Sequence, residues 1–154
     1  MREIELTKGF VTIVDDDDFD KLIQFKWHVN ERRGKQYARR WGGVKNGKVT
    51  MIWMHKEILK SEEEIDHING NGLDNRRENL RECSHKQNCA NRKPSGLSKY
   101  LGVYRFRDKW KSQIGSNGRK IGLGSFNDEI EAAKAYNEAA LKYHGEFARL
   151  NEVA

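Results

Sequence analysis

Proline and cysteine are scarce in this chain of 154 residues, which contains one proline and two cysteines. Two cysteines, Cys83 and Cys89, cannot build the disulfide framework of a small secreted domain. No stretch approaches the length of apolar sequence that a membrane-spanning helix needs, and residues 1–5 are not the start of a signal peptide. We therefore expect an intracellular protein that has no membrane partner.

Apolar residues are also sparse, at 36% of the chain, whereas charged residues make up 34%. So small an apolar share argues against one large core and favours small sheets with helices packed on them. Aromatic residues nevertheless reach 10%, with four tryptophans, which is too many for a disordered chain. The composition therefore predicts an α+β fold.

Acidic residues are outnumbered, 23 to 29, which leaves a formal charge of +6. The basic residues gather in two segments, 31–48 and 99–126, each with seven basic residues and one acid. Two separate basic patches predict a bipartite footprint on nucleic acid, and we expect double-stranded DNA. RNA binding and an ordinary solvated charged surface are the alternatives.

The single proline, Pro94, lies in a stretch over 91–98 that has the composition of a linker. We therefore predict a first domain over 1–93, a linker over 94–98 and a second domain over 99–152. The first domain opens with a β-rich region in which the aspartates of 15–20 form a solvated turn. The expected elements there are strands over 10–14, 27–29, 37–39 and 49–54, a helix over 18–25 and a helical turn over 55–60.

The rest of the chain splits into two simple patterns. Residues 64–91 follow the order of strand, long loop, strand and helix, with the strands at 64–69 and 80–83 and the helix from 84. The pattern over 101–126 predicts three strands, and that over 128–143 predicts a helix. Asn127 is the expected N-cap of this helix and Gly145 its stop, and an apolar stripe runs along it from Ala132 to Tyr143. This second pattern is a three-stranded antiparallel sheet packed on one helix, with a basic free face.

Asp66 and His67 are the first candidates for chemistry, because a carboxylate offers a hard metal ligand and an imidazole titrates near neutral pH. Asn88, on the predicted helix, offers a carbonyl oxygen that suits Mg²⁺. Asn79 precedes the second strand, where its amide can tie the loop across and hold His67 in one orientation. Neighbours on a strand point to opposite faces, so a shared site requires the strand to end or twist at this pair. His55 is left open between packing and phosphate contact.

The residues over 65–80, from Ile-Asp-His-Ile-Asn-Gly to Glu-Asn-Leu, followed by Gln-Asn-Cys-Ala-Asn over 87–91, resemble the HNH homing endonucleases of phages. Val-Asp-Asp-Asp-Asp at 14–18 and Phe-Lys-Trp-His at 25–28 are similar to the leader region of that group. The resemblance implies a ββα-metal nuclease core that uses one Mg²⁺ or Mn²⁺ ion. It also implies the role of each residue: metal ligation by Asp66 and Asn88, general-base catalysis by His67, and positioning by Asn79.

The C-terminal segment, with Leu-Gly-Val-Tyr-Arg at 101–105, Lys-Trp-Lys-Ser-Gln-Ile at 109–114 and Gly-Leu-Gly-Ser-Phe at 122–126, resembles the DNA-binding domain of plant ethylene-responsive (apetala-two) transcription factors. That resemblance implies a sheet lying in the major groove of DNA. The positions that this resemblance places facing the groove are Tyr104, Lys111, Gln113, Lys120 and Gly122. Those expected to hold phosphate are Arg105, Arg107, Lys109 and Arg119.

Together these features predict a site-specific homing endonuclease whose first domain cuts DNA and whose second domain selects the target. The alternative is a DNA-binding regulator with an inactive nuclease core. No heptad or apolar patch indicates a dimer, so we expect a monomer. The phage resemblance implies a phage-encoded protein in the cytoplasm of a bacterial host.

Overall fold

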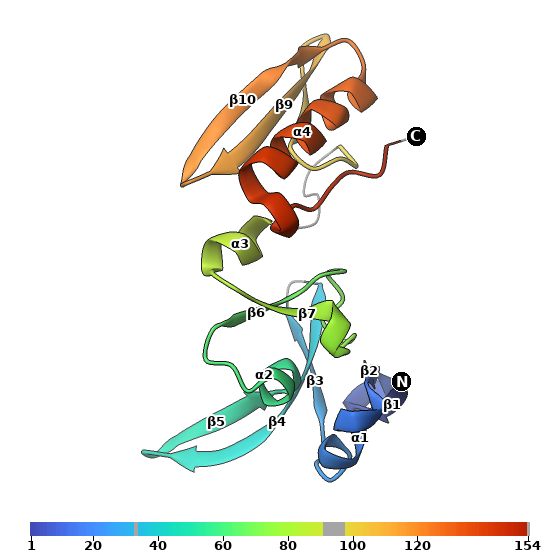
Figure 1. Cartoon of the computed structure of the whole chain (residues 1–154), viewed down its shortest axis with the longest axis vertical. Coiled ribbons are helices and arrows are strands. Elements are labelled where there is room, and N and C mark those ends of the chain that lie inside the picture. The colour runs from blue at the N-terminus through green and yellow to red at the C-terminus, as the bar shows by residue number, and fades with distance from the viewer. Residues whose placement is uncertain (33, 91–97, 154) are drawn as a thin grey trace. The chain divides into compact units, whose positions relative to one another are not determined.

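The computed structural model describes residues 1–32, 34–90 and 98–153 (Figure 1). It contains two compact units, Met1–Ser84 and His85–Ala154, and each is described by itself. Of the linker predicted over 94–98, residues 94–97 lie outside the described ranges, while Ser98 donates a hydrogen bond to Glu129 Oε1 of the second unit (2.8 Å). Among the described residues, no helix has the length and apolar character needed to cross a membrane.

The first unit consists of three small antiparallel sheets, formed by β1–β2, β3–β4–β5 and β6–β7, with two short helices. The β1–β2 pair was not predicted in full, because β1 carries charged residues at three of its four positions. The elements in chain order are β1 (Arg2–Glu5), β2 (Val11–Val14), α1 (Asp16–Leu22), β3 (His28–Arg32), β4 (Lys35–Lys45), β5 (Lys48–Trp53), α2 (Met54–Leu59), β6 (Glu64–His67) and β7 (Leu80–Cys83).

The core of this unit draws on nearly every element. β-branched residues favour β2, and Asn46 and Gly47, both with positive φ (52° and 73°), form the tight turn between β4 and β5. The fully buried indole of Trp27 donates from Nε1 to the carbonyl of Leu22 (2.8 Å). The buried apolar side chains are Ile4, Leu6, Val14, Leu22, Trp27, Val29, Ala38, Met54, Ile58, Ile65 and Leu80.

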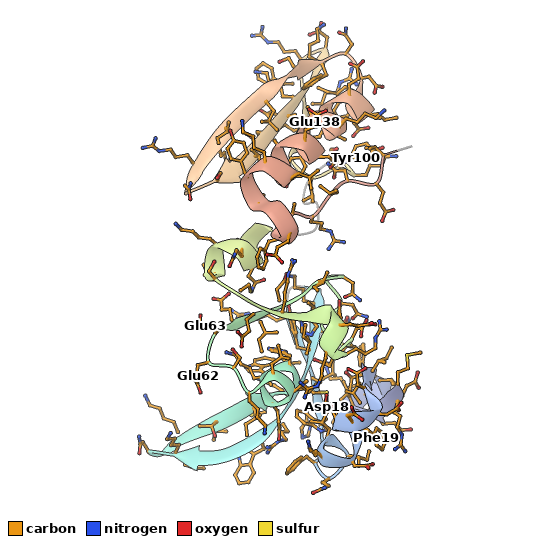
Figure 2. The ribbon with its side chains drawn as sticks, viewed as in Figure 1. Asp18, Phe19, Glu62, Glu63, Tyr100 and Glu138 are labelled. Atoms are coloured by element: carbon orange, nitrogen blue, oxygen red, sulfur yellow. The ribbon has the colours of Figure 1, made fainter. Side chains whose placement is uncertain are left out.

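The acidic run is not the solvated turn that we predicted. The aspartates at 16–18 form the first turn of α1, where negative charge favours the helix N-terminus. Asp18 is 4% exposed and accepts two hydrogen bonds from the Arg77 guanidinium (2.7 and 2.8 Å). Figure 2 labels Asp18 on α1, next to Phe19. Arg77, 59 residues further along the chain, therefore pairs with one buried aspartate of the run.

The second unit contains α3 (His85–Ala90), β8 (Val103–Phe106), β9 (Lys109–Ser116), β10 (Arg119–Phe126) and α4 (Glu129–His144). Its strands form a three-stranded antiparallel sheet in the order β10–β9–β8, and α4 packs along one face. The prediction of this sheet and helix is confirmed. The sequence order of β6, β7 and α3 is also as predicted. Because α3 belongs to the second unit and the two strands to the first, the ββα-metal arrangement stays a prediction.

Small side chains let α4 approach its sheet. Ala132, Ala133, Tyr136, Ala139 and Ala140 are buried against apolar residues of the strands, whereas Tyr143 is 41% exposed and does not belong to the stripe, contrary to our prediction. The predicted cap was also wrong by one residue. Asp128, not Asn127, accepts from the backbone N–H groups of residues 130 and 131 (2.8 and 3.1 Å).

Gly72 marks a close approach between the long loop and β4. A Cβ at this position would lie 2.3 Å from the backbone oxygen of Gln36 and 2.4 Å from Cδ1 of the Tyr37 ring. Only a residue without a side chain fits there, and the contact fixes the loop against the sheet.

Gly72→Ala is expected to lower the free energy of unfolding of the first unit by about 1–3 kcal/mol, because backbone and ring must both shift. Urea unfolding followed by tryptophan fluorescence measures the change. Gly115→Ala is the control, because a Cβ at that position has nothing within 4 Å. This variant should leave the urea midpoint of unfolding unchanged. Equal midpoints for the two variants would contradict the close approach.

Candidate active site

The β6–β7 ribbon carries the Asp-His pair at its end. In the antiparallel register Asp66 lies opposite Arg81 and His67 lies opposite Leu80. Both side chains of the pair are buried, with 6% and 5% of their surface exposed. The strand ends at His67, which is the geometry that a site shared by neighbouring residues requires.

Arg81 compensates the charge of the Asp66 carboxylate. Its guanidinium donates from Nη2 (2.8 Å) and from Nε (3.1 Å) to Oδ2 of Asp66, and this pair is largely shielded from solvent. The sequence analysis did not include Arg81, although its place directly across the ribbon follows from the pairing of the two strands. A buried carboxylate paired in this way is held in a defined position.

A chain of buried hydrogen bonds orients the ring of His67. Thr12 Oγ1 donates to the carbonyl of Leu73 (2.7 Å) and accepts from Asn75 Nδ2 (2.9 Å). The other end of that amide, Oδ1, lies 3.2 Å from His67 Nε2. Because Oδ1 can only accept, Nε2 carries the hydrogen, and Nδ1 of His67 is the basic nitrogen.

Asn75 was missed by the sequence analysis. It and Thr12 are both completely buried, and the backbone of β2 brings them together. Ile13 donates its N–H to the carbonyl of Leu73 (2.9 Å), and Asn75 donates its N–H to the carbonyl of Ile13 (2.8 Å). β2 thus forms a short bridge with the long loop, and no local pattern in either segment signals that contact.

Asn79 joins the two ends of the same loop. Its Oδ1 accepts from the backbone N–H of Asn69 (2.9 Å), and its Nδ2 donates to the backbone carbonyl of Asp74 (2.7 Å). The Asp74 carboxylate accepts from the Arg76 guanidinium (2.7 and 2.8 Å), which lowers the pKa of Asp74. These bonds make the loop that follows His67 a single connected structure.

Aromatic rings surround the imidazole of His67. Tyr37 lies 5.7 Å and His55 lies 5.1 Å from it between ring centroids, and Trp53 stacks on His55 at 6.1 Å. Burial lowers the pKa of His67, an effect that the Asn75 hydrogen bond opposes. The pKa of His55 falls to about 3, because burial, the neighbouring His67 and Lys56 all disfavour its charged form. Both rings are therefore neutral at neutral pH.

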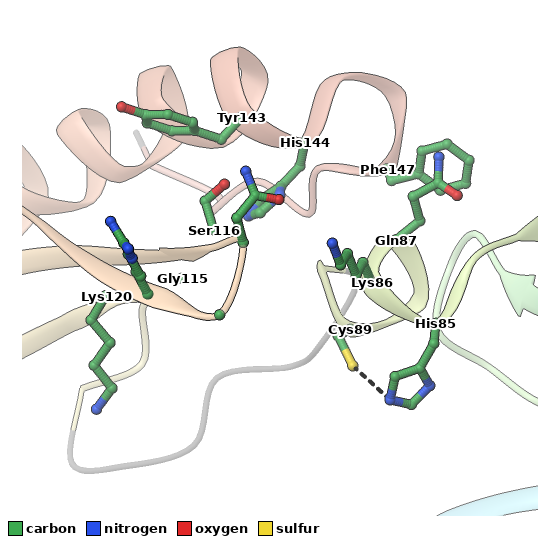
Figure 3. A pocket seen from close by; sticks show the side chains of 13 residues that line it. His85, Lys86, Gln87, Cys89, Gly115, Ser116, Lys120, Tyr143, His144 and Phe147 are labelled. Atoms are coloured by element: carbon green, nitrogen blue, oxygen red, sulfur yellow. Dashed lines mark hydrogen bonds between the residues drawn. The ribbon is translucent and has the colours of Figure 1, made fainter.

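Asn88, the second predicted metal ligand, lies on α3 and so in the second unit. Figure 3 shows His85, Lys86, Gln87 and Cys89 of the same helix beside a cavity of about 480 Å³ that also involves the β9–β10 turn and the end of α4. A carboxylate at Asp66 and an amide oxygen at Asn88 are hard donors, which fit Mg²⁺ or Mn²⁺. No cluster of three or more His, Cys, Asp or Glu side chains suited to a metal occurs among the described residues.

The candidate DNA-binding residues divide between positions on the second sheet. The register of β8, β9 and β10 places five of them on the face opposite α4, namely Tyr104, Lys109, Lys111, Gln113 and Lys120. Phe106, which the sequence analysis did not single out, shares this face, is 47% exposed and lies 4.5 Å from Lys111 Nζ. We call this surface the outer face of the second sheet.

The other three candidates are not on the outer face. Arg105 lies on the helix side at the sheet edge, with its guanidinium 5.4 Å from the Trp110 ring. Arg107 follows β8 with a positive φ of 57°, and Arg119 begins β10 beside the hairpin turn. All three lie at the border of the sheet rather than at its centre.

Residues 51–90 match the family model described as HNH endonuclease. This chain is also 26% identical over 147 residues to a protein of Acanthamoeba polyphaga mimivirus named as an HNH endonuclease, an alignment that covers 95% of this chain and 77% of the viral protein. The chain is thus similar to HNH endonucleases over residues 51–90, and the β6–β7 ribbon with Asp66 and His67 lies within the matched stretch.

Plant proteins form a second group of similar sequences. A dehydration-responsive element-binding protein, 2C, of Arabidopsis thaliana is 42% identical over 60 residues, and APETALA2-like protein 2 of Oryza sativa is 41% identical over 59. Each alignment covers 37% of this chain but only 18% and 14% of the plant protein. The chain is thus similar to proteins of the apetala-two type over a part of its length.

The depressed pKa of His55 makes stability depend on pH. An unfolded imidazole binds a proton near pH 6.5, whereas His55 in the folded protein does so only near pH 3. The unfolded state therefore binds more protons as the pH falls below 6.5. We expect the free energy of unfolding of the first unit to fall by up to about 1.4 kcal/mol per pH unit for each such histidine.

Urea unfolding at several values between pH 7.5 and 4.5 measures this slope. His55→Phe keeps an aromatic ring but removes the titrating group. The slope of its free energy of unfolding against pH should therefore be shallower than that of the wild type, by the contribution of about one proton. Equal dependence of the free energy of unfolding on pH in the two proteins would contradict a neutral, buried His55.

Proposed function

We propose that this protein is a site-specific DNA endonuclease of the HNH homing type, which hydrolyses phosphodiester bonds in double-stranded DNA. The observation that carries the proposal is the buried imidazole of His67, with Nε2 held by Asn75, next to the paired carboxylate of Asp66. The HNH endonuclease match over 51–90 and the mimivirus relative support it.

His67 serves as the general base in this proposal. Its Nδ1 takes a proton from a water molecule, and the resulting hydroxide attacks phosphorus in line with the leaving 3′ oxygen. Burial lowers the pKa of His67, which favours the neutral form of the ring that can accept a proton. Asn75 and, through the loop, Asn79 act as positioning residues, since they fix the ring and the backbone that follows it.

One Mg²⁺ or Mn²⁺ ion belongs to the proposal, with Asp66 and Asn88 as its protein ligands in a ββα-metal arrangement. When bound, such an ion stabilises the negative charge that develops on the phosphate oxygens and the leaving group. Arg81 restricts the rotation of the Asp66 carboxylate through two hydrogen bonds.

His67→Ala is expected to lower the rate of plasmid cleavage by about 10²–10⁴-fold, because the general base is lost. The assay follows conversion of supercoiled plasmids, carrying fragments of the source genome, to open-circular and linear forms with Mg²⁺ and with EDTA. His144→Gln, at the end of α4, is the control and should cleave at the wild-type rate. DNA affinity should change less than twofold, and undiminished cleavage by the His67 variant would refute the assignment.

The outer face of the second sheet selects the target in this proposal. A β-sheet of this size fits the major groove, where Tyr104, Lys111, Gln113 and Lys120 reach base edges. Lys109 on the outer face and Arg105, Arg107 and Arg119 along the border hold the phosphates. The similarity to plant proteins of the apetala-two type supports this reading.

Lys111→Gln is expected to weaken binding to a plasmid fragment that the protein cleaves by about tenfold, since a charged contact in the groove is lost. Lys134→Gln removes the same charge from the exposed side of α4 and should leave affinity unchanged. Electrophoretic mobility shift at fixed salt measures both. Equal losses for the two variants would show that only net charge matters and would contradict the outer face as the reading surface.

Binding without cleavage by the wild-type protein would favour the alternative, a DNA-binding regulator with an inactive core. A preference for RNA of the same sequence would refute DNA as the partner. We further propose that the protein acts as a monomer, and that it is encoded by a phage or another virus and works in the cytoplasm of the host. The viral source of the mimivirus relative supports a viral origin.

A further inference from the structure

The sheet β3–β4–β5 of the first unit has one covered face and one open face. Val29 and Ala38 lie on the covered face, in the core. The antiparallel register puts the alternate residues on the other side, where Asn30 pairs with Tyr37, Arg32 with Lys35, and Arg39 with Trp53. These six residues line a cavity of about 430 Å³, which we call the β3–β5 cavity.

The charge of the β3–β5 cavity has one sign. Arg32, Lys35 and Arg39 are basic, and no acidic residue is among its lining residues. Glu31, next to Arg32 in the chain, belongs to the opposite side of the sheet, where Lys8 Nζ donates to it (2.8 Å). A cavity with three cations, an amide and two aromatic rings favours a ligand that combines negative charge with a flat ring.

Two of its polar groups are suited to hold phosphate. Nε of Arg39 is buried and has no hydrogen-bond partner within the part of the chain that the structure describes, and its guanidinium lies 5.7 Å from the Trp53 ring centroid. A buried N–H without an acceptor is costly, and a phosphate oxygen would relieve that cost. Burial and the charge of Asp66 raise the pKa of Tyr37, so its hydroxyl stays protonated and can donate.

The cavity adjoins the candidate active site. Tyr37 forms one wall of the cavity, and its ring centroid lies 5.7 Å from His67 on one side and 6.1 Å from Trp53 on the other. Trp53 in turn stacks on His55, which touches His67. A ligand in the cavity therefore lies one aromatic ring away from the proposed general base.

We infer that the β3–β5 cavity binds one nucleotide of the DNA strand that is cut, next to the phosphate presented to His67. Arg39 and Lys35 bind its phosphate, and Trp53 provides a surface for its base or sugar. This inference rests on the proposed nuclease function. The first unit then has its own binding site for the DNA strand, separate from the outer face of the second sheet.

The test measures DNA binding in a full-length His67→Ala background, so that cleavage does not interfere. The probe is a fluorescein-labelled duplex from a plasmid region that the protein binds, or a mixed-sequence duplex if no region stands out. Arg39→Gln is expected to weaken binding by about tenfold, and Lys35→Gln by several-fold. Lys48→Gln, an equal charge change at an exposed position on the opposite side of the same sheet, should stay within twofold.

Photochemical crosslinking provides a second readout that does not depend on affinity. Duplexes with 5-iododeoxyuridine at successive positions should crosslink to Trp53 or Tyr37 at one or two positions, identified by peptide mapping. Urea unfolding of each variant checks that it folds. Equal losses for Lys35→Gln and Lys48→Gln, or crosslinks confined to the second unit, would overturn the inference.

The outcomes separate this inference from the proposed function. If Arg39→Gln lowers DNA affinity but the wild-type protein cleaves no DNA, the β3–β5 cavity remains a DNA-binding site and the proposed nuclease function is rejected. Active wild-type protein with unchanged binding in Arg39→Gln would keep the nuclease and reject the cavity. A dimer by light scattering that Trp53→Ala dissociates would show that a second copy, not DNA, occupies the cavity, and would also overturn the inference.

Discussion

The geometry of the candidate site depends on one chain of buried hydrogen bonds, from Thr12 through Asn75 to His67. Thr12 lies on β2, at the start of the protein, whereas the other two residues belong to the ribbon and loop of the stretch similar to HNH endonucleases. Because each group in the chain has a fixed role as donor or acceptor, the network decides which nitrogen of His67 is basic. The backbone bridge between Ile13 and the loop holds this network in place. The N-terminal β-rich region is therefore part of the catalytic apparatus that we propose, not only a scaffold in front of it.

A protein with so few apolar residues uses polar contacts to stabilise its interior. Two guanidinium groups, Arg77 and Arg81, pair with the buried carboxylates Asp18 and Asp66, and Asn79 closes the loop between the two strands of the ribbon. Such pairs contribute modestly to stability, but removal of one partner leaves an uncompensated buried charge. They specify one arrangement of a loop that apolar packing alone would leave loosely defined. That arrangement fixes the His67 ring next to the Asp66 carboxylate, the two residues to which we assign the general base and a metal ligand.

Each unit contains a three-stranded antiparallel sheet with one covered face and one basic face. In the second unit α4 covers the sheet with alanines, and in the first the apolar core does so. An antiparallel sheet can pack one face against the core and leave the opposite face open, and that open face is available for a ligand. The two basic segments of the sequence thus correspond to two surfaces, one in each unit. In our proposals the second surface selects a site, and the first holds the strand whose phosphate is attacked by the water that His67 deprotonates.

The sequence by itself determined the local features of this protein. Strand alternation, the alanine stripe of α4 and the Asp-His pair are all encoded by neighbours in the chain, so spacing and residue type predict them. Tertiary structure alone decided the partners of the site residues. Asn75 and Thr12 are 63 residues apart and Arg77 and Asp18 are 59 apart, and side-chain contacts over such distances leave no periodic trace in a sequence. The same holds for the β3–β5 cavity, because a basic segment shows its charge but not which face of a sheet will carry it.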